Sequence, residues 1–142
     1  MTDALDPAMA ETLNRVLYVD DEPDIRAIVE LSLRHVGGLD VRLAESGGQA
    51  LEILEARLEG WTPQLILLDA VMPGMDGPAT LAAIRARPTL DGVPVAFVTA
   101  MTQDSEVAAF KALGAVGVIA KPFDPLALPG RVRDVWGATI HP

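Results

Sequence analysis

Residues 65 to 69, Leu65-Ile66-Leu67-Leu68-Asp69, place four apolar residues in a row and close them with a carboxylate. A continuous apolar run of this length is typical of a strand that is covered on both faces, as in a parallel sheet. Two other stretches have the same design. Val16-Leu17-Tyr18-Val19 precedes Asp20-Asp21, and Val116–Ala120 precedes Lys121. Charged residues therefore stand where the buried strands are predicted to end.

Outward from these runs, strand-like stretches alternate five times with segments of helical period. The predicted strands are Val16–Asp20, Asp40–Ala44, Leu65–Asp69, Val93–Thr99 and Val116–Ala120. Five βα units with right-handed crossovers predict a parallel sheet with helices on both faces. The predicted fold class is α/β: a flavodoxin-like, doubly wound, five-stranded parallel sheet with strand order 2-1-3-4-5.

Helix boundaries are predicted from proline, glycine and capping residues. Pro23 suits the first turn of the first helix, and Gly37-Gly38 can end it with a left-handed cap. Ser46 and Gln49 have the spacing of a capping box at the start of the second helix. The third and fourth helices are predicted to begin near Gly77-Pro78 and after Thr102.

The last helix is predicted to run from Pro129 to Trp136. A helix starting at Asp124-Pro125 would meet Pro129-Gly130 within about one turn, where a proline ring clashes with the backbone. The stretch Asp124–Leu128 is therefore expected to be rich in turns.

The length of 142 residues fits one domain. We expect a flexible N-terminal leader over residues 1–13, which are polar, acidic and interrupted by Pro7, a folded domain over residues 14–137, and a C-terminal tail over residues 138–142.

Composition and charge exclude several classes of function. The net charge of −9 argues against direct nucleic-acid binding, because phosphates would be repelled. No apolar run approaches the roughly 20 residues that span a bilayer, and no signal peptide is recognisable, so we expect no membrane insertion. The chain has no cysteine, which excludes thiolate metal sites and fits a cytoplasmic location.

The strand ends predict a site. Carboxyl ends of parallel strands line one crevice, and strands one and three are neighbours in the predicted order, so Asp20, Asp21 and Asp69 should meet. Clustered carboxylates repel each other unless a cation lies among them, and Mg²⁺ prefers oxygen ligands. One oxygen of Asp69 could attack phosphorus, giving an aspartyl phosphate. Lys121 would neutralise phosphoryl charge, and Thr99 supplies a hydroxyl on the same rim.

Each of these residues taken alone has an ordinary structural explanation. Asp20-Asp21 alone more often marks a solvated helix N-terminus, where acidic side chains favour the helix dipole. Asp69 alone could form a turn before Pro73-Gly74, and Lys121 alone is typical of a protein surface. The joint placement of the charged residues at strand ends favours a functional site.

The chain resembles a response-regulator receiver domain of two-component signalling over roughly residues 15–136. The resemblance is carried by four segments, at the ends of strands one, three, four and five: Tyr18-Val19-Asp20-Asp21-Glu22-Pro23, Leu67-Leu68-Asp69-Ala70-Val71-Met72-Pro73-Gly74-Met75-Asp76-Gly77, Thr99-Ala100 and Lys121-Pro122-Phe123.

The resemblance implies a role for each matching residue. It implies that Asp20 and Asp21 bind the metal together with Asp69, which is the phosphorylated residue. It also implies that the main-chain carbonyl of Val71 completes the Mg²⁺ shell.

The same resemblance implies that Thr99 is the switch hydroxyl and that Lys121 pairs with the phosphate. It further implies a cis peptide at Lys121-Pro122, a form that costs little only before proline.

The implied function is phosphorylation-dependent signalling rather than enzymatic turnover of a free substrate. A sensor histidine kinase or phosphotransfer protein would donate the phosphoryl group, and a downstream protein would bind the face formed by the fourth helix, fifth strand and fifth helix. One departure affects this output. The position three before Lys121 is aromatic in many receivers and is Val118 here.

Two alternatives stay open. A phosphohydrolase of the haloacid-dehalogenase kind also forms an aspartyl phosphate, but it requires an Asp-x-Asp motif where this chain has Asp20-Asp21-Glu22, and a cap segment that is missing here. The other is a protein-binding module that keeps the fold and works without phosphorylation. The complete set of acidic residues, threonine and lysine argues against that alternative.

Overall fold

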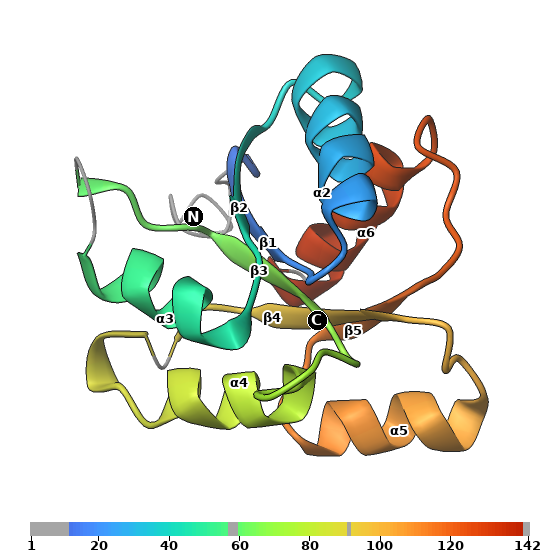
Figure 1. Cartoon of the computed structure of the whole chain (residues 1–142). Coiled ribbons are helices and arrows are strands. Elements are labelled where there is room, and N and C mark those ends of the chain that lie inside the picture. Colours follow the sequence, from blue (N-terminus) through green and yellow to red (C-terminus); the bar gives the residue numbers. More distant parts are fainter. Residues whose placement is uncertain (1–11, 57–59, 91, 141–142) are drawn as a thin grey trace, which may run out of the picture.

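The computed structural model describes residues 12–56, 60–90 and 92–140. Its centre is a sheet of five parallel strands in the order β2-β1-β3-β4-β5 (Figure 1). The strands are β1 (Arg15–Val19), β2 (Asp40–Ala44), β3 (Leu65–Asp69), β4 (Val95–Thr99) and β5 (Gly117–Ala120). The predicted sheet and strand order are confirmed, as are the limits of β2 and β3, whereas the limits of β1, β4 and β5 differ by one or two residues.

Helices connect the strands and cover both faces of the sheet. They are α2 (Pro23–Glu30) with the π-helical η2 (Leu31–Val36), α3 (Gly47–Ala56), α4 (Gly77–Arg85), the 3-10 turn η4 (Pro88–Leu90), α5 (Asp104–Ala112) and α6 (Leu128–Ile140). Helices α2 and α6 lie on one face, and α3, α4 and α5 lie on the other (Figure 1).

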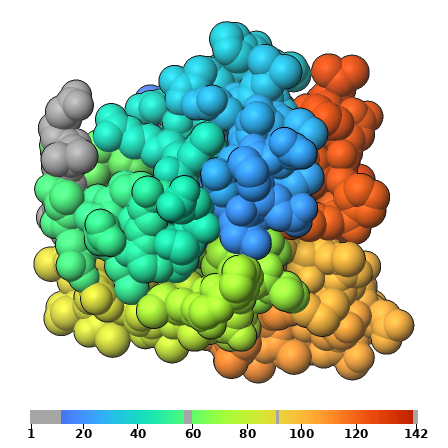
Figure 2. Space-filling view, in the orientation of Figure 1, coloured from blue at the N-terminus to red at the C-terminus, as the bar shows by residue number. Residues whose placement is uncertain are grey.

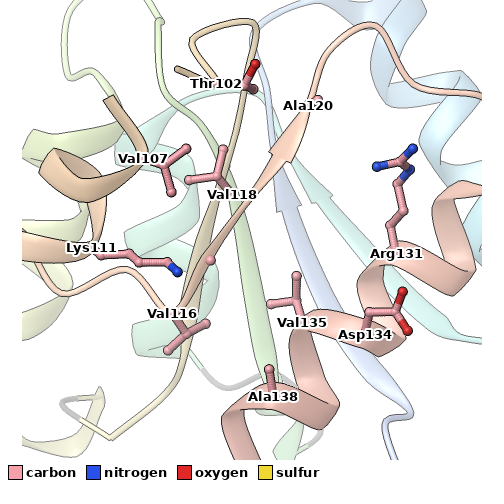
Figure 3. Close-up of a pocket in the computed structure, with 11 residues that line it drawn as sticks. Thr102, Val107, Lys111, Val116, Val118, Ala120, Arg131, Asp134, Val135 and Ala138 are labelled. Carbon is pink, nitrogen blue, oxygen red and sulfur yellow. The ribbon is translucent and has the colours of Figure 1, made fainter. Parts of the chain in front are cut away.

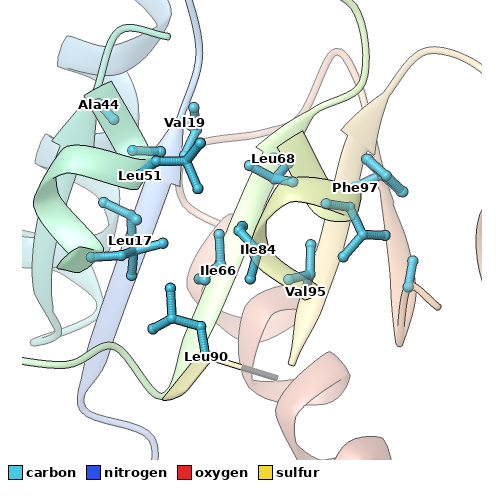
Figure 4. Close-up of a cluster of buried hydrophobic side chains, with 14 of the residues drawn as sticks. Leu17, Val19, Ala44, Leu51, Ile66, Leu68, Ile84, Leu90, Val95 and Phe97 are labelled. Atoms are coloured by element: carbon cyan, nitrogen blue, oxygen red, sulfur yellow. The ribbon is translucent and has the colours of Figure 1, made fainter. Parts of the chain in front are cut away.

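Alternate residues of the central strand β3 feed two separate cores. Ile66 and Leu68 point into the cluster beneath α3 and α4, where Ile84 packs among them (Figure 4). Leu65 and Leu67 point into the opposite cluster, beneath α2, η2 and α6. This alternation explains why the strand has no polar position before Asp69, since both faces are buried.

The first helix changes its winding in its second half. Over η2 the chain forms a π-helix, and the Gly37 amide donates to the Ser32 carbonyl five residues back at 3.0 Å. Ser32 and Leu33 are adjacent and both buried, and the Ser32 hydroxyl donates to the Pro125 carbonyl. Gly38 has φ of 70°, so the predicted left-handed end of this helix is confirmed.

The predicted limits of the last helix are wrong. Helix α6 begins at Leu128 and continues to Ile140, past the predicted end at Trp136. Pro129 is the second helical residue, where its missing N–H and its ring are tolerated, so it opens the helix instead of delaying it. Residues 138–140 are therefore helical rather than part of a tail, and residues 141–142 lie outside the described residues.

The predicted leader is also one residue too long at its end. Leu13 is buried and belongs to the cluster beneath α2 and α6, so it is part of the folded domain. Residues 1–11 lie outside the described residues.

Candidate functional site

The register of the central strands brings the predicted residues to one edge of the sheet. Val19 is paired with Leu68, so Asp20 and Asp69 follow neighbouring positions of β1 and β3. Thr99 ends β4 and is paired with Ala120, the residue before Lys121. The predicted meeting of the strand ends is confirmed, because parallel strands end at the same edge.

The carboxylates of Asp20, Asp21 and Asp69 each offer an oxygen within 4.8 Å of the others. Lys121 bridges two of them: its Nζ lies 3.1 Å from Asp20 Oδ2 and 3.3 Å from Asp69 Oδ2. Asp20 and Asp69 are buried, and Asp21 is more exposed. The cluster thus holds three carboxylates and one ammonium group that bridges two of them, which leaves a net negative site that suits a further cation.

Asp20 is held from several directions. Its Oδ2 accepts hydrogen bonds from the Tyr18 hydroxyl at 2.6 Å and from Lys121, and its Oδ1 accepts one from the Glu22 amide at 3.0 Å. The Arg26 guanidinium donates to the Asp20 main-chain carbonyl at 2.7 Å. Asp69 has fewer contacts, with Lys121 and, at 3.3 Å, the Val71 amide.

The pKa values of the two buried carboxylates, Asp20 and Asp69, are shifted in opposite directions. Burial alone would raise the pKa of Asp20, but hydrogen bonds from Tyr18, the Glu22 amide and Lys121 outweigh it, so the Asp20 pKa lies below its usual value. Burial and the charge of Asp20 raise the pKa of Asp69 to about 6, against the attraction of Lys121. The ionised form of Asp69 is therefore disfavoured until a further cation compensates it.

The two other groups of this network also titrate away from their usual values. Burial lowers the pKa of Lys121, but its hydrogen bonds and the charges of Asp20 and Asp69 raise it overall, so the ammonium form is maintained. Burial and the bond to Asp20 raise the pKa of Tyr18, so its hydroxyl remains a donor.

Asp69 lies beside an open cavity of about 290 Å³, which Thr99, Lys121, Val71 and Met101 also line. The Thr99 hydroxyl is buried in the rim, where it accepts a hydrogen bond from the Met101 amide at 3.1 Å. Val71 is exposed. In the space-filling view the start of α2 lies next to the segment between β3 and α4 (Figure 2), so the carboxylates lie where these segments meet.

Sequence reasoning missed two residues that support this site. No role in the site was predicted from the sequence for the Tyr18 hydroxyl or for Arg26, which donate to the side chain and to the main-chain carbonyl of Asp20. Tyr18 precedes Asp20 by two residues, so both side chains lie on the same side of the strand, and that spacing was an available signal. The cis peptide expected at Lys121-Pro122 is present.

The donor set fits Mg²⁺. Lys121 alone does not neutralise the negative charge of the three carboxylates. The atoms that they offer to a metal ion are all oxygens, which Mg²⁺ prefers as ligands. Together these features define a class: a doubly wound α/β domain whose acidic, lysine-bridged crevice suits a cation and a phosphoryl group.

Comparison with known proteins places the chain within this class. A family model described as the response regulator receiver domain matches residues 16–133. The chain is 37% identical over 120 residues to the DNA-binding response regulator MtrA of Mycolicibacterium smegmatis, and 36% identical over 121 residues to a probable transcriptional regulator, ycf27, of Porphyridium aerugineum. Those matches cover 84% and 85% of this chain but 49% and 47% of the relatives, so the chain spans about half their length.

A comparison with solved structures leads to the same family. The chemotaxis response regulator CheY4 of Vibrio cholerae superposes with a TM-score of 0.75 at 31% identity, covering 87% of this chain and 99% of that one. The chain therefore belongs to the response regulator receiver domain family. Phosphorylation-dependent signalling, as predicted from the sequence, is the function of this family. Among the described residues, no helix is both long and apolar enough to cross a bilayer.

Proposed function

We propose that Asp69 accepts a phosphoryl group from a phosphohistidine of a sensor histidine kinase or phosphotransfer protein. The observation that carries the proposal is the Lys121 ammonium, which lies between Asp20 and Asp69 at the carboxyl edge of the sheet. Asp20, Asp21, Asp69 and the Val71 carbonyl would hold Mg²⁺, which when bound supplies charge neutralisation for the transferring group.

In the transfer step an Asp69 carboxylate oxygen forms a bond to phosphorus, and the phosphorus–nitrogen bond of the donor breaks with its electron pair leaving on the histidine. Lys121 offsets the charge on the phosphoryl oxygens. Thr99 lies on the same cavity and can donate its hydroxyl to one of those oxygens once the group is in place. The open cavity beside Asp69 gives the donor histidine access.

Phosphorylation would then change the affinity for a downstream protein by shifting the balance between two conformations. We assign the readout to a groove of about 400 Å³ between α5 and α6, across the edge strand β5 (Figure 3). Val107, Val118 and Val135 form part of its apolar lining. Val118, at the position that is aromatic in many receivers, lies in this lining.

Charge indicates the kind of partner that fits the groove. Lys111 and Arg131 both border it, and they are the two lysine or arginine side chains within the described residues that have no hydrogen bond, ion pair or ring contact. Asp134 also lines the groove, but the two cations outnumber it, so in a chain of net charge −9 this groove favours an apolar segment flanked by acidic residues. Membership of the family also supports a cytoplasmic location.

The phosphorylation site is tested by incubation with acetyl phosphate and Mg²⁺, with incorporation followed by mass spectrometry. Asp69→Asn should abolish incorporation, and the exposed Asp24→Asn should retain it. Undiminished labelling of the Asp69→Asn variant would remove Asp69 from the mechanism. The phosphorylation-independent alternative predicts that neither Mg²⁺ nor beryllofluoride binds, and the phosphohydrolase alternative predicts multiple turnover of a free phosphate ester.

The groove is tested with valine methyl groups observed by NMR. Beryllofluoride with Mg²⁺ should shift the Val118 and Val135 methyl resonances in the wild-type protein but not in Asp69→Asn. Unchanged resonances in the wild-type protein, with beryllofluoride demonstrably bound, would exclude this groove as the readout.

A further inference from the structure

The three carboxylates of the cluster differ in how firmly the protein holds them. Asp20 is fully buried and its carboxylate accepts three hydrogen bonds, from Tyr18, Glu22 and Lys121. Its own main-chain carbonyl is fixed by Arg26. Asp69 accepts one long bond from the Val71 amide besides its contact with Lys121. Asp20 is therefore the rigid member of the set.

The Tyr18 hydroxyl makes the shortest of these bonds, at 2.6 Å, and it comes from inside the core. The Tyr18 ring is only 1% exposed and packs in the cluster beneath α2 and α6. Because the ring is packed in the core, the position of the Tyr18 hydroxyl is fixed. A buried hydroxyl also requires a hydrogen-bond acceptor, and Asp20 Oδ2 provides it. Lys121 is different, because its long chain is partly exposed and also contacts Asp69.

We propose that Tyr18 is a positioning residue that fixes the Asp20 carboxylate so that the acidic cluster selects Mg²⁺ over Ca²⁺. The inference rests on the metal site proposed above. It adds a determinant of ion selectivity that contacts a metal-binding carboxylate and does not itself bind the ion.

The physical reason is the different tolerance of the two ions. Mg²⁺ requires near-ideal octahedral geometry with oxygens at about 2.0–2.1 Å, whereas Ca²⁺ accepts variable geometry at about 2.3–2.6 Å. Removing the hydroxyl would leave Asp20 Oδ2 with the partly exposed Lys121 ammonium as its remaining partner, so this oxygen would be held less firmly while the charge of the cluster stays unchanged. A looser carboxylate costs Mg²⁺ more than Ca²⁺. Loss of a hydrogen-bonding partner behind a metal ligand typically lowers metal affinity by about 10–100-fold.

The test compares Tyr18→Phe with the wild-type protein in NMR titrations with Mg²⁺ alone and with Ca²⁺ alone. The dissociation constant for Mg²⁺ should rise by about 10-fold, at the lower end of that range. The dissociation constant for Ca²⁺ should rise by less than about threefold, because that ion tolerates variable geometry. Thr80→Val is the matched control: Thr80 is fully buried, and within the described part of the chain its hydroxyl donates to the Asp76 carbonyl and to none of the three carboxylates. It should leave both constants unchanged.

A merely structural role for Tyr18 would lower stability without changing the ratio of the two constants. Equal weakening of both ions, or an unchanged Mg²⁺ constant, would overturn the inference.

A second measurement does not depend on the variant. Tyr18 is the only tyrosine of the chain, so 3-fluorotyrosine labelling gives a single ¹⁹F resonance at this site. Mg²⁺ should shift that resonance, and a resonance that stays in place while Mg²⁺ binds would also overturn the inference.

The two proposals fail in different ways. If the wild-type protein binds Mg²⁺ and is phosphorylated on Asp69, but Tyr18→Phe keeps its selectivity, only the positioning role is lost. If the wild-type protein binds no Mg²⁺ at all, the proposed metal site itself is refuted.

Discussion

Replacing Asp69 by asparagine should stabilise the metal-free protein at neutral pH. The ionised carboxylate is buried beside Asp20, which raises its pKa from 3.8 to about 6 in the folded chain. Asparagine has a similar shape and no charge, and its side-chain oxygen can keep the bond from the Val71 amide. Lys121 retains Asp20 as its partner. The substitution therefore removes mainly an electrostatic cost.

The size of the effect follows from the pKa. A shift of about 2 units corresponds to about 3 kcal/mol, at about 1.4 kcal/mol per unit. Because the folded-state pKa of Asp69 is raised, protonation favours the fold: this contribution is fully present below about pH 4 and is lost as the pH rises through about 6. The stability gained by Asp69→Asn should thus be near zero at pH 4 and reach about 2–3 kcal/mol above pH 7.

Urea unfolding followed by circular dichroism, in EDTA at several pH values, measures this difference. Asp24→Asn is the control for loss of an exposed carboxylate and should show little change at any pH. Adding Mg²⁺ should narrow the gap, because the ion stabilises the wild-type protein more than the variant. A variant that is less stable than the wild-type protein at pH 8 in EDTA, or a gap that does not depend on pH, would refute this account of the site.

Three further predictions concern packing and charge. Gly77→Ala should lower the free energy of unfolding by about 1–3 kcal/mol, since a Cβ would lie 2.7 Å from the Asp69 carbonyl oxygen, whereas Gly92→Ala has open space; equal urea midpoints would contradict this. Phe110→Ala should cost about 3 kcal/mol, because the ring packs on Phe97 with centroids 4.7 Å apart, and a loss below about 1 kcal/mol in the same assay would argue against that packing. The double substitution Lys111→Glu and Arg131→Glu should weaken binding of a helical peptide that has leucines on one face and glutamates beside them. A fluorescence titration should show a loss of affinity of at least about 10-fold. Unchanged affinity would show that these two charges do not contribute to recognition.

The sheet could be predicted almost completely from the sequence. Its inner strands are uninterrupted apolar runs, and Leu65–Asp69 in particular has only one physical environment that suits it, a strand buried on both faces. The strand order was that of the flavodoxin-like fold, and the meeting of Asp20, Asp69 and Lys121 followed from that order.

The parts that could not be predicted depend on tertiary contacts. The start of α6 depends on whether Pro129 falls in the first turn or the middle of a helix, and composition alone does not decide that. The π-helical winding of η2 accompanies the bond from Ser32 to Pro125, 93 residues away. The hydroxyl of Tyr18 matters because Asp20 is buried beside it, a fact that a strand pattern does not contain.

The bridge from Lys121 to Asp20 joins positions 101 residues apart, so it can form only after β5 and Lys121 have been synthesised. A nascent polypeptide that still lacks β5 would have its carboxylates but no ammonium group to face them. Competence to receive the proposed phosphoryl group would then be acquired late, with the docking of the last strand. Partly synthesised or partly folded copies would therefore not accept the phosphoryl group, and no separate inhibitory mechanism would be needed to keep them inactive.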